Sequence, residues 1–274
     1  MVLEGKATAI RLESVSLSLG GRPILEDLSV EIPAGMVTAV MGPSGAGKTT
    51  VMRLITGQLK PDRGSVWLGE TRVDTLKSRQ LNELRKNIGV LLQNGALFTD
   101  LTAFDNVALP LREHSGLPET LIRRIVLLKL QTVGLRGAGD LYPRELSGGM
   151  NRRVAMARAM ALDPDLMLYD EPFAGLDPIS LGVSLRLIRE VNQALGTTSV
   201  VITHDVGEVA KLADVVCIIA DRKLVATGSP QDLEQSDHPL VRQFVDGLPD
   251  GPVPFHYPAQ SLADQMLDNR EPRQ

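Results

Sequence analysis

The sequence has few cysteines and few aromatic residues, and each shortage excludes a class of protein. Its 274 residues include one cysteine, Cys217, so an internal disulfide and a cysteine-rich metal site are both excluded. This residue lies in the apolar run Val215-Val216-Cys217-Ile218-Ile219, so we expect a buried, inert thiol. Aromatic residues make up only 3% of the chain, too few for a platform on which nucleic-acid bases stack.

Excess positive charge and long apolar runs are also missing. The formal net charge of -4 argues against tight nucleic-acid binding through phosphate neutralisation. No apolar run reaches the roughly 18 residues that a membrane-spanning helix needs. No secretory signal peptide follows Met1. We therefore expect a cytosolic chain that binds no nucleic acid and that can dock on a membrane protein.

What the sequence does contain is a phosphate-binding loop, named here the phosphate loop: Gly42-Pro43-Ser44-Gly45-Ala46-Gly47-Lys48-Thr49-Thr50. It fits the pattern G-x-x-x-x-G-K-[ST]. The glycines let the backbone bend where a Cβ would clash, and the inward-pointing N–H groups form a nest for an anion. Lys48 can reach the terminal phosphates, and the Thr49 hydroxyl can ligate Mg²⁺. A buried strand over 36–41 and a helix over 50–57 flank the loop in the order that such a loop requires.

The rest of the chain alternates strands with helices, which predicts an α/β fold. An antiparallel β layer is expected over 8–32, before the phosphate loop. Further buried strands are expected over 88–92, 166–169, 199–203 and 215–220, and helices over 75–87, 147–162, 179–195 and 207–212. Such alternation implies a largely parallel sheet whose ligand lies beyond the carboxyl ends of the strands. Residues 94–134 form a mostly helical block inserted into this core.

Two of the predicted strands end on polar residues that suit phosphate chemistry. Asp170, at the end of strand 166–169, can hold Mg²⁺ directly or through water. Glu171 can accept a proton from an attacking water molecule, and His204 is a donor that can hold a γ-phosphate. A pair of surface carboxylates and a purely structural histidine are the alternatives.

With these motifs in this order, the sequence resembles the ATP-binding subunits of ABC transporters over about residues 8–245. Beyond the phosphate loop, the matches are Gln93 (glutamine loop), Leu146-Ser147-Gly148-Gly149-Met150 (signature), Asp170-Glu171 after an apolar strand, Gly175-Leu176-Asp177 (the segment where two subunits meet) and His204 (switch histidine). The resemblance implies the ABC ATPase fold. This fold has a RecA-like P-loop NTPase core with a mostly parallel sheet, an antiparallel β layer and a helical subdomain.

The resemblance also implies how the chain divides into parts. The ABC ATPase domain would cover 1–247, with its core in 1–93 and 159–247 and the helical subdomain over about 94–158. A Pro-rich C-terminal extension would cover 248–274.

The activity implied by the resemblance is ATP hydrolysis between two copies of the chain. Glu171, His204 and Gln93 would be catalytic, and Thr49, Gln93 and Asp170 would hold Mg²⁺. The signature residues Ser147, Gly148, Gly149 and Met150 would face the ATP that the second copy binds. Asp177 would contact the second copy itself. A serine N-cap is the plainer interpretation of Ser147. The dimer would drive an integral membrane permease, touched mainly by residues 94–112.

A closer resemblance is to the ATPases of Mla-type phospholipid transporters. It rests on Asn94-Gly95-Ala96-Leu97-Phe98-Thr99-Asp100, Asp105-Asn106-Val107, Pro110-Leu111-Arg112-Glu113-His114, Met150 and Asp250-Gly251-Pro252-Val253-Pro254-Phe255. It implies a complex at the cytoplasmic face of the bacterial inner membrane that moves phospholipids between inner and outer membranes. An MCE-domain lipid-binding subunit and a STAS-domain cytosolic subunit would be further partners.

Three other functions stay open. The chain could serve an amino-acid or drug transporter, act as a soluble ABC protein of DNA repair or translation, or be a nucleotide-binding regulatory subunit without turnover. The second is disfavoured because such proteins carry two ATPase units or long insertions, and this sequence has one phosphate loop.

Two positions depart from the family pattern. Leu19 stands where most members place an aromatic residue on adenine, so we expect weak adenine selectivity unless Arg22 contributes. Met150 replaces the usual glutamine, which removes an amide near the composite site and is expected to slow hydrolysis.

The C-terminal extension has a composition of its own. Residues 248–258 hold four prolines, which excludes a packed helix or a central strand. Val253, Phe255 and Tyr257 are spaced by two, so all three could face one surface of an extended segment. Docking onto a neighbouring subunit and a disordered tail both remain open.

Overall fold

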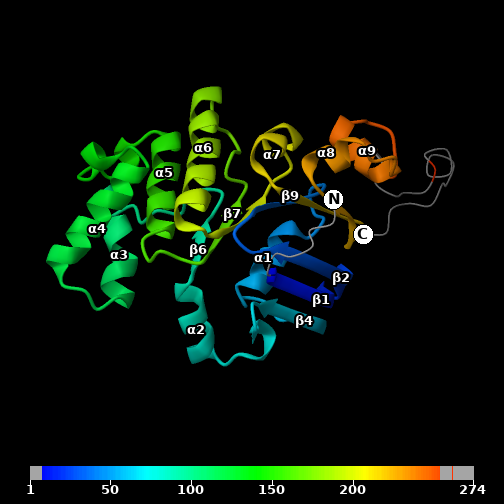
Figure 1. Ribbon diagram of the computed structural model, residues 1–274, viewed down its shortest axis with the longest axis horizontal. Coiled ribbons are helices and arrows are strands. Elements are labelled where there is room, and N and C mark those ends of the chain that lie inside the picture. Colours follow the sequence, from blue (N-terminus) through cyan, green and yellow to red (C-terminus); the bar gives the residue numbers. More distant parts are fainter. Residues whose placement is uncertain (1–7, 254–260, 262–274) are drawn as a thin grey trace, which may run out of the picture.

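Two β-sheets form the framework of the molecule, and the one that contains β1, β2 and β4 lies at its edge (Figure 1). The computed structural model describes residues 8–253 and 261. In this part of the chain, a six-stranded sheet has the order β10-β9-β3-β8-β7-β6 and a four-stranded sheet has the order β2-β1-β4-β5. The strands are β1 (Thr8–Leu19), β2 (Arg22–Pro33), β3 (Val37–Met41), β4 (Arg63–Leu68), β5 (Thr71–Arg72), β6 (Ile88–Leu91), β7 (Leu166–Asp170), β8 (Thr198–Ile202), β9 (Val215–Ala220) and β10 (Lys223–Gly228).

Two groups of helices occupy opposite ends of the molecule. The helices α3, α4 and α5 (green in Figure 1) lie at one end, and α8 and α9 lie at the other. The bounds are α1 (Lys48–Ile55), α2 (Ser78–Lys86), α3 (Ala103–His114), α4 (Glu119–Thr132), α5 (Gly148–Ala159), α6 (Pro178–Leu195), α7 (Val206–Leu212), α8 (Pro230–Glu234) and α9 (Pro239–Asp246). Among the described residues, no helix is both long enough and apolar enough to cross a membrane.

The larger sheet confirms the predicted α/β architecture. Its strands β3, β9, β8, β7 and β6 pair in parallel, and β10 pairs antiparallel to β9. Every residue of β3, β8 and β9 is buried, as expected for strands covered on both faces. Cys217 in β9 is 1% exposed, which confirms that it is buried, and burial raises the pKa of its thiol to about 11. Because the strands run in parallel, their polar carboxyl ends meet at one edge.

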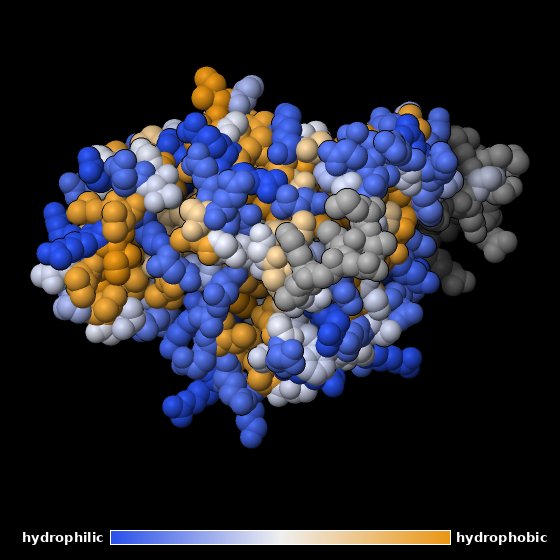
Figure 2. Space-filling model, in the orientation of Figure 1, coloured by the Kyte–Doolittle hydropathy of each residue, from blue (hydrophilic) through white to orange (hydrophobic). Residues whose placement is uncertain are grey.

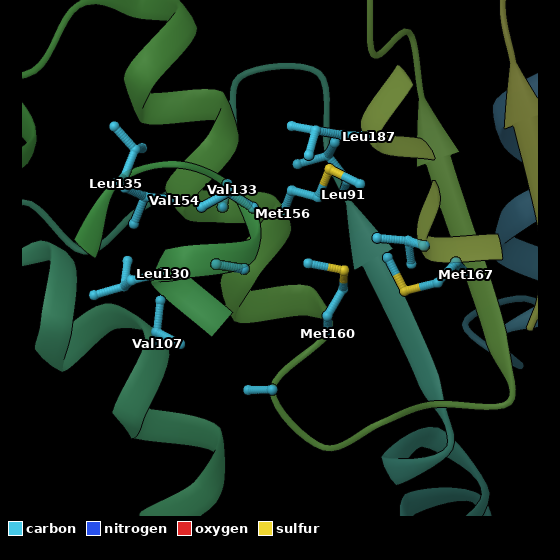
Figure 3. Packing of buried hydrophobic residues seen from close by; sticks show 14 of the residues in the cluster. Leu91, Val107, Leu130, Val133, Leu135, Val154, Met156, Met160, Met167 and Leu187 are labelled. Carbon is cyan, nitrogen blue, oxygen red and sulfur yellow. The ribbon is translucent and has the colours of Figure 1, made fainter. Parts of the chain in front are cut away.

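An apolar core joins the helical end of the molecule to this sheet. Figure 3 shows the cluster, which includes Val107 of α3, Leu130 of α4, Val154 of α5, Met160 directly after α5, and Met167 of β7. Truncating one large buried side chain of this kind to alanine typically costs about 2–5 kcal/mol, because lost burial and the cavity add up. Helix α5 is therefore held firmly against the strands that lead into the candidate site.

Some predicted boundaries were wrong by a few residues. The helix predicted over 75–87 begins at Ser78, since Val73–Thr75 forms a 3-10 turn and Leu76 is extended. Strands β6 and β8 end at Leu91 and Ile202, each two residues before the polar residue expected at the strand end. Gln93 and His204 therefore lie on loops, where their side chains have more freedom.

Helices α8 and α9 were missed by the sequence analysis. Their start signals are present, because Pro230 and Pro239 occupy the first turns and Ser229 caps α8. Leu233 and Val241 pack with Ile218 in a small apolar cluster beside β9. These two helices cover the end of the sheet far from the helical block.

Candidate functional site

The phosphate loop makes a sharp bend between β3 and α1 that requires glycine. At Gly42 φ is 146°, and a Cβ there would lie 1.9 Å from the main-chain oxygen of Ile219. At Gly47 φ is 95°, and a Cβ would lie 2.8 Å from the side chain of Leu25. As N-cap of α1, Gly47 supplies no side-chain acceptor, so the first N–H groups of that helix face the loop and favour an anion.

Lys48 is held inside this bend by neutral acceptors. Its side chain Nζ donates to the carbonyl oxygens of Gly42 at 2.7 Å and Pro43 at 3.0 Å. Burial lowers the pKa of the Lys48 ammonium, and the negative charges of Glu171 and Asp170 oppose that effect. The Lys48 ammonium thus lies beside the first N–H groups of α1. The negative charges of Glu171 and Asp170 act on it there.

A cleft of about 420 Å³ opens beside the phosphate loop. This volume lies in the range of ordinary ligand pockets. Its lining residues are Ile24, Ser44, Gly45, Gly47, Lys48, Thr49, Thr50, Gln93, Asp170, Glu171 and His204. The fold therefore brings the predicted phosphate, metal and catalytic residues to one place. Ile24, which sequence reasoning did not single out, joins them because β2 runs beside the loop.

Asp170 and Glu171 end β7 with different surroundings. Burial raises the pKa of the Asp170 carboxyl, helped by the charge of Glu171 and opposed by Arg53 and Lys48. Glu171 has a left-handed φ of 47° and its N–H donates to the carbonyl of Ile202 at 2.8 Å. Such a conformation costs a non-glycine residue about 1 kcal/mol or more. The hydrogen bond to Ile202 of β8 holds the Glu171 main chain in this conformation.

His204 contacts the Glu171 carboxylate directly. The imidazole Nδ1 lies 2.9 Å from Oε1 and 3.0 Å from Oε2 of Glu171. With the proton on Nδ1, the imidazole donates to the carboxylate and presents Nε2 outward. The predicted base and the predicted switch histidine thus form one pair.

The donor chemistry of the cleft fits Mg²⁺. Thr49 offers a hydroxyl, Gln93 an amide oxygen and Asp170 a carboxylate, and all three line the cleft. Mg²⁺ takes oxygen ligands and commonly combines one or two carboxylates with phosphate oxygens and water. Their role as metal ligands stays a prediction.

The signature residues lie outside this cleft. Ser147 caps α5, its Oγ accepting from the N–H of Met150 at 3.2 Å. Ser147 and Gly148 are exposed, and a Cβ on Gly149 would lie 2.9 Å from the Ser180 hydroxyl. The Met150 side chain packs against the apolar core of the helical end. An N-cap role for Ser147 is therefore present, and its role toward a second nucleotide stays a prediction.

Asp177 also has a local structural role. It is the N-cap of α6, and its Oδ1 accepts from the N–H groups of Ile179 and Ser180, both at 3.0 Å. Contact with a second copy is untested and stays a prediction.

The structure locates Leu19 and Arg22 outside the cleft and describes residues 248–253 of the C-terminal extension. Leu19 ends β1 with 37% exposure and does not line the cleft, nor does Arg22. In the tail, the main chain of Val253 exchanges two hydrogen bonds with the Gln243 amide, at 2.8 and 2.9 Å. Phe255 and Tyr257 lie outside the described residues.

Known proteins resemble this chain in sequence over most of its length. The family described as ABC transporter matches residues 25–174. The "Intermembrane phospholipid transport system ATP-binding protein MlaF" of Haemophilus influenzae is 52% identical over 94% of this chain and 98% of its own length. The protein with the same name from Escherichia coli K12 is 53% identical over 95% and 97%.

A solved structure gives the same fold. It is a dimeric post-hydrolysis state of the ATP-binding cassette MJ0796 with ADP and Pi, with a TM-score of 0.74 and 29% identity. It covers 81% of this chain and 98% of its own. The fold expected from the resemblance is confirmed.

Proposed function

Because this chain belongs to the ABC transporter family, we propose that it is the ATP-hydrolysing subunit of a bacterial inner-membrane complex that moves phospholipids between the inner and outer membranes. The observation that carries the ATPase assignment is the cleft that gathers the phosphate loop, Gln93, Asp170, Glu171 and His204. The lipid cargo rests on similarity to relatives over 94–95% of this chain.

The polar residues of the cleft divide the steps of hydrolysis among them. The phosphate loop and Lys48 bind the phosphates of ATP. Thr49, Gln93 and Asp170 would hold Mg²⁺, which neutralises phosphate charge. Glu171 takes the proton of the attacking water, and His204 orients Glu171 through their contact.

Two copies of the chain would enclose two ATP molecules. The signature lies on the exposed start of α5, outside its own cleft, so it is available to a nucleotide bound by the other copy. Asp177, exposed at the start of α6, would meet that copy. The dimeric state of a structural relative supports this arrangement.

The membrane permease would dock in a second groove. A groove of about 580 Å³ lies between α2 and the segment around α3. Phe98, Leu109 and Pro110 contribute apolar surface to it, and Arg85 and His114 contribute polar surface. These residues include part of the 94–112 segment expected to touch the permease.

The helical end offers further apolar surface to other subunits. Figure 2 shows apolar residues gathered over the α3–α4 end of the molecule. Leu121 and Leu128 of α4 are 40% and 66% exposed. We assign residues 94–158 to a helical subdomain and 248–274 to a C-terminal extension. The proposed partners are the permease, an MCE-domain subunit and a STAS-domain subunit, on the cytoplasmic face of the inner membrane.

The experiment that tests the proposal is purification of the native membrane complex through a tag on this chain. We expect a permease, an MCE-domain subunit, a STAS-domain subunit and bound phospholipid, together with ATP-dependent phosphate release. A solute-binding protein in place of the lipid-binding subunit would favour an amino-acid or drug transporter. Nucleic-acid binding would favour a non-transport ABC protein.

A further inference from the structure

Arg152, in the second turn of α5, binds main-chain carbonyls of two separate loops. Its Nη1 donates to the carbonyl oxygens of Pro172 at 3.0 Å and Ala174 at 2.9 Å. Its Nη2 donates to the carbonyl oxygen of Gln93 at 2.9 Å. A single guanidinium therefore links three segments that are distant in the sequence.

The two loops are those that carry the reacting groups. Gln93 follows β6, and residues 172–174 follow Glu171 directly. Strands β6 and β7 are parallel neighbours, with Leu91 opposite Tyr169, so the two loops leave the sheet side by side. The second loop continues to Asp177, the N-cap of α6. A change in the distance between these loops would change the position of Gln93 relative to Glu171.

The helix that supplies Arg152 is the one that begins at the signature. Ser147 caps α5 five residues before Arg152, and the apolar core holds α5 against β6 and β7. The guanidinium thus connects the exposed signature end to both loops. A shift of α5 would be transmitted to their main chains.

The three bonds are needed because the cation has no acidic partner. Among the described residues, Arg152 forms no ion pair with a carboxylate. Burial alone lowers the pKa of its guanidinium. A partly buried charge left without acceptors is costly, and hydrogen bonds to a charged group are stronger than those between neutral groups. Both loops are therefore held at positions where the guanidinium N–H groups of Arg152 reach all three carbonyl oxygens.

The two other arginines of α5 that bind main-chain carbonyls do not join the two loops: Arg158 reaches only the Gln93 loop, at Gly95 and Ala96, and Arg153 reaches neither loop. Arg153 donates to the carbonyl of Val133, after α4, at 3.1 Å. Arg158 donates to the carbonyls of Ala96 and Gly95 at 2.8 and 2.7 Å. Arg153 thus offers a matched control, with the same side chain on the same helix but no bond to either reacting loop.

We propose that Arg152 is a positioning residue for ATP hydrolysis, which couples the signature end of α5 to the Gln93 loop and to the loop after Glu171. The inference rests on the proposed ATPase function and deepens it. Arg152 does not line the nucleotide cleft, so its loss should alter the arrangement of reacting groups and leave nucleotide binding intact.

The test compares Arg152→Lys and Arg152→Met with Arg153→Lys and Arg153→Met, each in the full-length chain assembled with its membrane subunits. Lysine keeps the charge but lacks the planar fork that spans separate acceptors. We expect both Arg152 variants to lower kcat by about tenfold or more, with the KM for ATP and nucleotide affinity within about twofold of wild type. Both Arg153 variants should keep kcat within about twofold.

Three results would overturn the inference. They are an unchanged kcat in the Arg152→Lys variant, a fall in nucleotide affinity as large as the fall in kcat, and an equal loss of kcat in the Arg153 variants. Should Arg152→Met fail to fold, Arg152→Lys decides the matter by itself. Failure of the proposed function would look different, since wild type would then release no more phosphate than the Glu171→Gln variant.

Discussion

The imidazole of His204 lies 2.9 Å from the carboxylate of Glu171, although the two residues are 33 positions apart. The His204 side chain is 66% exposed, and that of Glu171 is 16% exposed. The histidine is therefore the solvent-facing member of the pair, and it can be displaced without disturbing the core. The Glu171 main chain is hydrogen-bonded to Ile202 of β8, so Glu171 is the fixed member of the pair.

Replacing Glu171 with glutamine should separate nucleotide binding from turnover. The amide keeps the shape of the side chain but cannot accept a proton, so we expect phosphate release to fall by about 10²–10⁴-fold. Nucleotide affinity should stay within about threefold, because the phosphate loop is untouched. Glu190→Gln, on the exposed face of α6, is the control. Near-normal turnover in the Glu171 variant would remove the general-base assignment.

Lys48→Ala should weaken ATP binding by about 10–100-fold, equivalent to about 1.4–2.8 kcal/mol. The change removes the ammonium that Gly42 and Pro43 hold at the loop. Isothermal titration with an ATP analogue that resists hydrolysis measures the effect. Lys60→Ala, an exposed site after α1, controls for the loss of charge. Equal affinities for the two variants would count against the assigned phosphate site.

Alanine substitutions at two glycines of the phosphate loop should differ sharply in stability. At Gly42, a Cβ would lie 1.9 Å from the Ile219 main chain, and we expect a loss of more than about 3 kcal/mol in the free energy of unfolding. At Gly45, φ is 81° and no heavy atom lies within 4 Å, so Gly45→Ala should cost about 1–2 kcal/mol. Urea unfolding measures both. Similar losses would show that steric contact does not decide the bend.

Asp170→Asn should stabilise the folded chain at pH 7 while abolishing activity. Burial raises the folded pKa of Asp170 above its usual value of 3.8, so the ionised form destabilises the fold. The carboxyl's favourable contribution is full below pH 3.8 and is lost as pH rises through the folded pKa. The stability gain of the variant should therefore shrink as pH falls toward 4. A gain that is constant from pH 7 to 4 would contradict this assignment.

Asp177→Asn should show the opposite sign. Hydrogen bonds from the side chain and main chain of Ser180 lower the pKa of Asp177 below 3.8. Its contribution is present above pH 3.8 and is lost as pH falls through the folded pKa. Asparagine still caps the helix, so only the charge-dependent part should disappear at pH 7. Thermal unfolding across the pH series measures both aspartate variants, and equal signs would refute the pair of predictions.

Gln243→Met should free the segment that follows α9. Gln243 is 8% exposed, and its amide supplies both hydrogen bonds to the Val253 main chain. Without them, limited proteolysis should cut residues 248–253 about tenfold faster, since cleavage follows the population of the open form. Gln231→Met on the exposed face of α8 is the control. Equal cleavage rates would show that the amide does not hold the segment.

Local features of the site could be predicted from the sequence because they depend on local backbone requirements. Glycines at 42, 45 and 47 mark the bend, and buried strands before Lys48 and Asp170 place these residues at the edge of a parallel sheet. Ser147 was placed at a helix start, where the structure has it as a cap, whereas the capping role of Asp177 was not predicted. Helix α9 could have been found from Pro239 at its start and Gly247 at its end.

Contacts between distant segments were decided by the tertiary structure. Nothing in the pattern near His204 shows that its ring reaches Glu171, and nothing near Arg152 shows its bonds to carbonyls 20, 22 and 59 positions away. Periodicity reports which face of an element is buried but not which loop lies beside it. Strand order and helix packing set those distances. The sequence by itself therefore determined the chemistry available at the sheet edge, and the packing of β6, β7, β8 and α5 decided which groups meet there.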